Sequence, residues 1–401
     1  MIEKSEKTPD QAIAELAGRI APVASETISL ANASGRILSQ PIHADRDSPA
    51  ADVSAMDGYA IRLDDLGRDE PLPVSGEIAP GHPTPDVQPG HAMRVFTGGI
   101  VPQDYDLVVK REETQESPES IRLLPATANC RKGENIRRQG ENASQGSAIL
   151  QAGTTLHAGA IAATANFGAS EVHVSRVLKI TILVTGDELH DVDAEVQPWQ
   201  LRDSNGPTLN ALLSGKNWLH VRCVDRVVDN QQGLAERLAA AIEDSDAVIL
   251  TGGVSMGDYD FVPDAIGQND GEVIFHRLPI RPGKPILGAV TAAGKPIIGL
   301  PGNPVSAAVG CRRFVLPLLS RQAGKRDWLP PAPRVMLDDP GTRTLPLHWF
   351  RLVQIDDQGG VSLVPSKGSG DLVSMAASDG FTEQPPNSTG PGPWPFWRWQ
   401  D

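Results

Sequence analysis

The short apolar runs in the middle of the chain carry the clearest secondary-structure signal. Four of them have the length and β-branched content of buried strands, and they are residues 179–185, 219–224, 246–251 and 297–300. Helical patterns stand between or after these runs, at 207–216, 231–243 and 304–320. Strands that alternate with helices predict a parallel, doubly wound α/β sheet.

The segments on either side of this region have a different pattern. Thr8 and Gln11 match a capping box, with Pro9 in the first turn, so a helix is expected to begin there. From 43 to 142, short apolar runs alternate with turns, which indicates a small β domain. A second small β domain is expected after the proline-rich linker 330–333. Its tail is either a final strand or a partner-binding segment.

The composition narrows the classes of function. The chain has 401 residues and a formal net charge of −14, so general binding to nucleic acid is not expected. No run of 18 apolar residues predicts a membrane span, and no apolar signal core opens the sequence, so we expect a cytoplasmic protein. Three scattered cysteines and nine dispersed histidines show no paired metal-ligand spacing. A P-loop and a dinucleotide-binding glycine motif are missing from the sequence as well.

The loop after the strand 246–251 is the first candidate site. In an open parallel sheet, ligands bind beyond the carboxyl ends of the strands. Gly252, Gly253 and Ser255 form a glycine turn of the kind that binds anions through backbone N–H groups. A tight turn without a ligand is the alternative interpretation.

Four carboxylates stand in two of the loops that follow predicted strands of this sheet. Asp187 and Glu188 follow one strand, and Asp258 and Asp260 follow another. Carboxylates beside a phosphate site are typical of Mg²⁺ held between protein and phosphate oxygens. Helix capping or a solvated loop is the alternative, and the metal role is favoured for Glu188 and Asp260.

Two further segments add groups that bind anions. The run from Pro301 to Ser306 ends a strand and opens a helix, whose free N–H groups and serine hydroxyl make an anion site. An ordinary helix cap has the same pattern. Arg281 and Lys284 place two cations on a stiff loop with two prolines, although surface cations are common.

Seven short motifs stand in a fixed order along the chain. They are Ser54–Ala60, Thr97–Gly99, Asn135–Arg138, Thr185–Leu189, Thr251–Ser255, Pro282–Pro285 and Leu300–Ser306. In this order they resemble the molybdopterin molybdenumtransferases, the family of bacterial MoeA and the gephyrin E domain, over nearly the whole chain.

The resemblance implies a multidomain α/β protein. A discontinuous helical domain would span 1–42 and 143–176, with a small β domain inserted at 43–142. The doubly wound, molybdopterin-binding domain would span 177–325, and a C-terminal β-barrel 326–401. The resemblance also implies an elongated homodimer with its active sites between the subunits.

The reaction implied by the resemblance is molybdenum insertion. Molybdate and adenylylated molybdopterin are the substrates, the phosphoanhydride is cleaved with release of AMP, and Mg²⁺ is required. A molybdopterin adenylyltransferase and the receiving molybdoenzymes would be partners.

The same resemblance assigns roles to residues of this chain. Molybdate would be held by Arg281, Lys284, Ser306, Arg351 and Ser369. The pterin and its pyrophosphate would contact Gly252, Gly253, Ser255, Pro301, Gly302, Asn303, Pro304, Arg137 and Arg138. The catalytic set would be Asp57, Thr97, Glu188, Asp229, Asp260 and Lys284. The metal ligands would be Asp187, Glu188 and Asp260.

The chain also departs from the family pattern. Asn142 stands where an acidic residue is usual, and Arg281 stands where lysine is common. A non-catalytic molybdopterin-binding scaffold is one alternative, and Asn142 favours it. An adenylyltransferase-like enzyme is another, and the sequence Val254-Ser255 after the two glycines counts against it, because that enzyme carries Thr-Gly there.

Overall fold

The computed structural model describes residues 6–254 and 261–400. The chain divides into two compact units, and each is described by itself. The first unit contains Met1–Gln40, Ala152–Ile161 and Glu171–Asp401, and the second contains Pro41–Gln151 and Ala162–Ser170. Within the described ranges, no helix has both the length and the apolarity needed to cross a membrane. The division into four domains stays a prediction.

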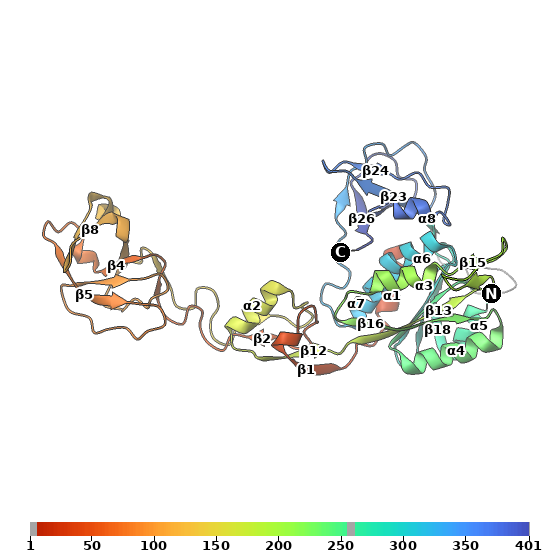
Figure 1. Cartoon of the computed structure of the whole chain (residues 1–401), viewed down its shortest axis with the longest axis horizontal. Helices are drawn as coiled ribbons and strands as arrows, with labels where there is room; N and C mark the ends of the chain where they lie inside the picture. Colours follow the sequence, from red (N-terminus) through yellow and green to blue (C-terminus); the bar gives the residue numbers. More distant parts are fainter. Residues whose placement is uncertain (1–5, 255–260, 401) are drawn as a thin grey trace. The chain divides into compact units, whose positions relative to one another are not determined.

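A six-stranded sheet forms the centre of the first unit (Figure 1). Its strand order is β16 (Leu219–Val227), β13 (Leu178–Thr185), β17 (Ala247–Thr251), β21 (Pro296–Leu300), β20 (Leu287–Thr291) and β18 (Gly271–His276). The first four strands are parallel, whereas β20 and β18 are antiparallel to their neighbours. The four strands predicted from the sequence are thus parallel as expected, but the sheet as a whole is mixed, because it also contains β20 and β18, which the sequence pattern does not predict. Only residues 292–295 join β20 to β21, and so short a connection permits a hairpin but no crossover helix.

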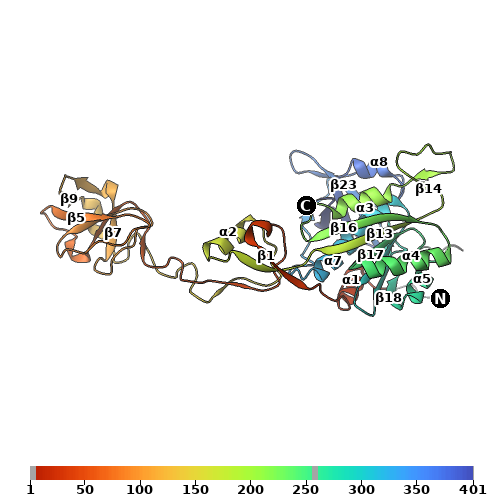
Figure 2. The ribbon, with the colours of Figure 1, turned by 60° about the horizontal axis from the view of Figure 1, so that its bottom comes forward.

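Helices cover both faces of this sheet, because its buried side chains alternate between two cores (Figures 1 and 2). Ile182 and Val184 point into one core, and Leu183 points into the other. The first core is shared with α1 (Pro9–Ala17), α3 (Asn205–Leu213), α6 (Pro304–Gly310) and α7 (Leu316–Gln322). The second core is shared with α4 (Gln231–Asp244) and α5 (Val262–Gln268). The sheet is thus covered on both faces, as expected for a doubly wound fold.

The helix predicted to begin after Thr8 is α1, and its capping box is present. The Thr8 hydroxyl accepts a hydrogen bond from the Gln11 N–H, and the Gln11 side chain accepts one from the Thr8 N–H. The helix predicted at 304–320 is α6 and α7, joined by a π-helical turn at Cys311–Val315. The remaining short elements are α2 (Ala158–Asn166), the antiparallel pair β1 (Ser25–Ser29) and β12 (Glu171–Ser175), and the parallel pair β14 (Leu189–His190) and β15 (Leu201–Arg202).

A second sheet of the first unit contains the C-terminal strands. Its order is β19 (Ile280–Arg281), β23 (His348–Ile355), β25 (Gly380–Gln384), β26 (Trp394–Arg398) and β22 (Arg334–Val335), with β24 (Val361–Leu363) on β23. A short helix, α8 (Leu372–Ala376), follows β24. The tail thus contains a final strand, β26. Closure of this sheet into a barrel stays a prediction.

The second unit is built on a sheet whose strands lie inside the predicted β domain. Its order is β7 (Leu107–Lys110), β4 (Gly58–Ile61), β6 (Ala92–Val95), β5 (Leu72–Ile78), β9 (Ser120–Leu123) and β8 (Thr114–Glu116). Two short antiparallel pairs join β3 (Val53–Ser54) to β10 (Ile136–Arg137) and β2 (Ile42–His43) to β11 (Ala148–Leu150).

Candidate functional site

Four loops meet at one edge of the central sheet. They follow β16, β13, β17 and β21, which are parallel neighbours, so the carboxyl ends of the strands lie together. Thr185 pairs with Val227, and Thr251 pairs with Leu300. This edge therefore gathers the loops predicted from the sequence to form one site.

Asn205, at the start of α3, connects two of these loops. Its Nδ2 donates to the Thr251 hydroxyl at 2.9 Å and to the Gly302 carbonyl at 2.8 Å. The Thr251 hydroxyl in turn donates to the Pro301 carbonyl at 3.2 Å. The glycine turn and the Pro-Gly-Asn-Pro loop are thus held by one buried amide.

The glycine turn requires its first glycine. Gly252 has φ of +93°, and a Cβ at this position would lie 2.5 Å from the Thr185 hydroxyl oxygen. A Cβ on Gly302 would lie 3.6 Å from the Gly252 Cα, so the two loops approach closely. The predicted site residues Ser255 and Asp260 lie outside the described residues, as does Asp258.

Three carboxylates gather where β13 and β16 end. The Asp229 N–H donates to Asp187 Oδ1 at 3.0 Å. Burial, together with the negative charges of Asp187 and Glu188, raises the pKa of the Asp229 carboxyl above its usual value. Carboxylates that repel one another in this way favour binding of a cation.

The donor chemistry of this acidic group fits Mg²⁺. In the described part of the chain, no three side chains from His, Cys, Asp or Glu are arranged to hold a metal ion by themselves. Mg²⁺ commonly takes only one or two protein carboxylates, with substrate phosphate and water as its other ligands. Asp187, Glu188 and Asp229 can supply such oxygens.

A cavity of about 680 Å³ lies between the central sheet and the C-terminal sheet. Segment 280–285, the loop before α6 and the first turn of α6 form one wall, and β23 with segment 363–369 forms the other. The five residues predicted to hold molybdate all line it, and they are Arg281, Lys284, Ser306, Arg351 and Ser369. Pro301 and Asn303, predicted to contact the pterin, line the same cavity.

The cavity is cationic, because arginine and lysine side chains line it and no Asp or Glu occurs among its described lining residues. Arg351 Nη1 donates to the Pro340 carbonyl at 2.6 Å and to Gln384 Oε1 at 3.2 Å, both of which are neutral oxygens. Burial lowers the pKa of Arg351, which still stays protonated at neutral pH. The Val305 N–H donates to the Ser369 carbonyl at 3.0 Å, which draws segment 363–369 to the start of α6. This arrangement suits a tetrahedral oxyanion.

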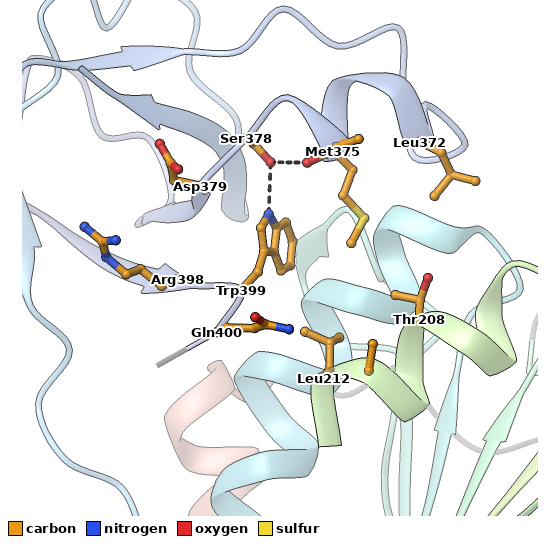
Figure 3. A pocket seen from close by; sticks show the side chains of 11 residues that line it. Thr208, Leu212, Leu372, Met375, Ser378, Asp379, Arg398, Trp399 and Gln400 are labelled. Carbon is orange, nitrogen blue, oxygen red and sulfur yellow. Dashed lines mark hydrogen bonds between the residues drawn. The ribbon is translucent and has the colours of Figure 1, made fainter. Parts of the chain in front are cut away.

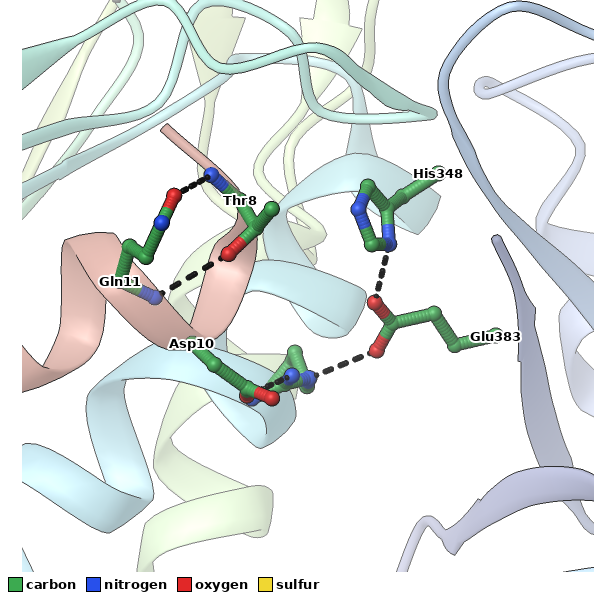
Figure 4. Close-up of polar contacts among 6 residues, drawn as sticks. Thr8, Asp10, Gln11, His348 and Glu383 are labelled. Carbon is green, nitrogen blue, oxygen red and sulfur yellow. Dashed lines mark hydrogen bonds and ion pairs between the residues drawn. The ribbon is translucent and has the colours of Figure 1, made fainter. Parts of the chain in front are cut away.

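An ion-pair network that is buried at Arg313 and Glu383 and exposed at Asp10 supports the wall of the cavity (Figure 4). Arg313 Nε donates to Glu383 Oε2 at 2.9 Å, and its Nη2 donates to Asp10 Oδ1 at 2.5 Å. The other Glu383 oxygen lies 2.6 Å from His348 Nδ1. Since His348 begins β23 and pairs with Ile280, the network fixes both walls of the cavity relative to α1.

A second cavity, of about 630 Å³, lies between α3, α8 and the end of the chain (Figure 3). Leu212, Leu372 and Met375 line it, together with Trp399, whose indole N–H donates to the Ser378 hydroxyl at 3.0 Å. None of the site residues predicted from the sequence is among its described lining residues.

The predicted site residues Asp57 and Thr97 belong to the second unit. Asp57 Oδ1 accepts hydrogen bonds from the Thr97 N–H at 2.8 Å and from its hydroxyl at 2.7 Å. These two bonds hold the pKa of the Asp57 carboxyl below its usual value. Both side chains are exposed on the surface of this unit, and their catalytic role stays a prediction.

Arg137 and Arg138 also belong to the second unit, and both are paired there. Arg137 Nε donates to Glu141 Oε1 at 2.5 Å, and its Nη2 donates to Asn142 Oδ1 at 2.9 Å. Arg138 Nη1 donates to Asp52 at 2.5 Å. Asn142 thus lacks an acidic charge, but Glu141, the residue immediately before it, supplies one beside Arg137.

Two residues of the cation-lined cavity have no motif to mark them in the sequence. Arg343 and Trp349 both line it. Trp349 lies in β23, two positions before Arg351, and Arg343 lies in an irregular segment between β22 and β23. Only the folded chain brings Arg343 to the predicted molybdate residues.

Comparisons with known proteins match two family models. The model described as the MoeA N-terminal region, domains I and II, matches residues 7–168. The model described as a probable molybdopterin binding domain matches residues 181–321.

Similar whole chains are also known. A molybdopterin molybdenumtransferase from a Nostoc species is 34% identical over 383 residues, which cover 91% of this chain and 86% of that one. The Haemophilus influenzae protein of the same name is 35% identical over 81% of this chain and 80% of its own. The crystal structure of a molybdopterin biosynthesis MoeA protein from Pyrococcus horikoshii is 25% identical, with a TM-score of 0.80, over 99% of this chain and 98% of its own.

Proposed function

The chain belongs to the molybdopterin molybdenumtransferase family, and from this premise we propose that it transfers molybdenum from molybdate to adenylylated molybdopterin with Mg²⁺-dependent release of AMP. The observation that carries the proposal is the cation-lined cavity. Arg281, Lys284 and Arg351 surround it together with two serines, and no carboxylate lies among its described lining residues. Molybdate is a tetrahedral dianion, and such an ion needs cations and hydroxyl donors.

The neighbouring sheet edge fits the rest of the substrate. The Gly252 N–H donates to the Leu300 carbonyl at 3.1 Å within the sheet, whereas Gly253 next to it has no side chain that would keep a pyrophosphate away. Pro301 and Asn303 line the cavity and also belong to a loop at that edge. We therefore place the pyrophosphate along the glycine turn, with the dithiolene end of the pterin toward the molybdate residues.

Catalysis in this arrangement is mainly electrostatic. When the phosphoanhydride bond breaks, negative charge on the phosphate oxygens is stabilised by Lys284 and by the N–H groups of the turn. Asp187, Glu188 and Asp229 would hold Mg²⁺, together with Asp260, and the ion would supply Lewis-acid stabilisation of the pyrophosphate. No general base is assigned for the water.

The test is single-turnover release of AMP. The full chain is mixed with adenylylated molybdopterin and Mg²⁺, with and without molybdate, and Lys284→Ala is the matched variant. We expect AMP release that depends on molybdate and is lost in the variant. Tight binding of the pterin without AMP release would instead support a binding scaffold, and consumption of ATP would support an adenylyltransferase.

We also propose that the functional protein is a homodimer. In this proposal Asp57, Thr97, Arg137 and Arg138 of one subunit act at the cleft of the other. Sedimentation velocity tests the assembly. AMP release by a mixture of Asp57→Asn and Lys284→Ala chains tests the shared site, because only a mixed dimer restores one complete cleft.

A further inference from the structure

Arg343 adds a fourth cation to the cavity. It lines the cavity with Arg281, Lys284 and Arg351, although its own segment, between β22 and β23, has no regular structure. Its guanidinium carbon lies 5.6 Å from the centre of the Trp349 ring, and that of Arg351 lies 4.5 Å from the same centre. One indole therefore contacts two guanidinium groups at the cavity wall.

Arg343 has an exposed side chain, and among residues 6–254 and 261–400 no carboxylate lies within ion-pair distance of it. Some other exposed arginines of this acidic chain pair with carboxylates, for example Arg111 with Glu116 and Arg222 with Asp244. A guanidinium beside an aromatic ring and three other cations is available to an anion from solution.

We propose that Arg343 binds the tetrahedral oxyanion and that Trp349 positions its guanidinium over the cavity. This inference rests on the proposed function, since it names a further binding residue for the same substrate. A guanidinium offers a planar pair of N–H donors that matches two oxygens of molybdate or tungstate, whereas a lysine offers a point charge. Stacking on the indole restricts the side chain before the ligand arrives and reduces the entropy lost on binding.

The test is titration calorimetry of the full chain with sodium molybdate and sodium tungstate. Arg343→Ala is expected to raise the Kd for both anions roughly ten-fold, because a charge-assisted contact is lost. Arg343→Lys is expected to give an intermediate Kd. The matched control is Arg334→Ala, which removes an exposed arginine that contacts the Pro393 carbonyl outside the cavity. An unchanged Kd in Arg343→Ala would overturn the inference.

Trp349→Leu separates positioning from charge. The four cations remain, but the ring that contacts both Arg343 and Arg351 is lost, so the Kd is expected to rise. In the double variant, the part of this effect that acts through Arg343 is already absent, so the two effects are expected to sum to less than their separate values. Effects of the two substitutions that simply add would overturn the positioning role.

Failure of the inference on Arg343 can be distinguished from failure of the proposed function. If the unaltered chain releases AMP in response to molybdate while Arg343→Ala binds molybdate equally well, the inference alone fails. If Arg343→Ala weakens molybdate binding but the unaltered chain releases no AMP, the proposed reaction fails and the role of Arg343 stands.

Discussion

The cation-lined cavity and the acidic strand ends of the first unit differ in the sign of their charge and in how that charge is held. In the cavity, Arg351 donates to two neutral oxygens and forms no direct ion pair with a carboxylate of the described residues. At the strand ends, burial and the charges of two neighbouring carboxylates raise the pKa of Asp229. Each region is thus prepared for a ligand of opposite charge.

The comparison shows why the net charge of −14 says little about the ligand. An acidic chain has carboxylates available to neutralise most of its arginines, yet the described lining of the cavity contains none. Local segregation of charge therefore determines what binds, and the overall field of the protein does not.

Removal of a cavity cation is expected to have the largest effect. Arg351→Met keeps the length of the side chain but loses its charge, so AMP release at a fixed molybdate concentration should fall roughly a hundred-fold. Single-turnover kinetics with quantified AMP measures this. Arg351→Lys is the control and should keep more activity. A rate that does not change in Arg351→Met would show that the cavity does not serve the oxyanion.

Separation of the two loops at the sheet edge should have the next largest effect. Asn205→Ala removes the donor to Gly302 and to the buried Thr251 hydroxyl, which should lower the free energy of unfolding by about 2 kcal/mol. Urea unfolding followed by circular dichroism measures it. Asn210→Ala, on the exposed side of the same helix, should change stability by less than about 0.5 kcal/mol. An equal loss of stability in Asn205→Ala and Asn210→Ala would mean that the Asn205 amide does not link the two loops.

Removal of one negative charge from the carboxylates where β13 and β16 end should raise the stability of the protein and weaken its response to Mg²⁺. Asp229→Asn relieves the repulsion among three carboxylates, so the free energy of unfolding should rise by ~0.5 kcal/mol. The Mg²⁺ concentration for half-maximal AMP release should rise several-fold, because one oxygen charge is lost. Thermal unfolding without Mg²⁺ and a Mg²⁺ titration measure the two effects. A variant that loses stability and keeps its Mg²⁺ dependence would contradict both the repulsion and the metal role.

The smallest effect is expected from substitution of Asp371, a carboxylate near the cavity whose hydrogen bonds order the local structure. Asp371 accepts hydrogen bonds from the Lys367 N–H and from Ser374, and these lower its pKa to about 2 from 3.8. Because the folded-state pKa is the lower one, the stabilisation is complete above the unfolded value and is lost as the pH falls toward about 2.

The matching measurement compares Asp371→Asn with the unaltered chain. The melting temperatures should differ at neutral pH and converge as the pH falls toward about 2, where the carboxylate is protonated. A difference that is independent of pH would show that the charge of Asp371 is not what orders the segment next to Ser369.

Regular patterns with a local cause could be predicted from the sequence. The capping box of Thr8 and Gln11 concerns neighbouring residues, and the apolar strands β13 and β17 are buried on both faces, so their sequences are uninterrupted. The parallel direction of these strands followed, and with it the meeting of the glycine turn and the Pro-Gly-Asn-Pro loop at one edge.

Other features could not be predicted, because their causes lie in remote parts of the chain. β25 has the polar sequence Thr-Glu-Gln at its end, yet all three side chains are buried. Partners on other elements satisfy two of them, whereas the Thr382 hydroxyl has no hydrogen-bond partner among the described residues. Glu383 is matched by Arg313, and Gln384 by Arg351. Asn205 and Arg343 likewise have no local signature, since their importance depends on loops that only the fold brings near them.

The ion pair between Asp10 and Arg313 also has a consequence for the order of synthesis. These residues are 303 positions apart, and Glu383 follows Arg313 by 70 more. At roughly 5–20 residues per second, a ribosome needs roughly 15–60 s to make the partner of Asp10 after Asp10 itself. The first helix therefore emerges long before its place in the fold exists, because the elements against which α1 packs, β18, β20 and α7, end only at Gln322.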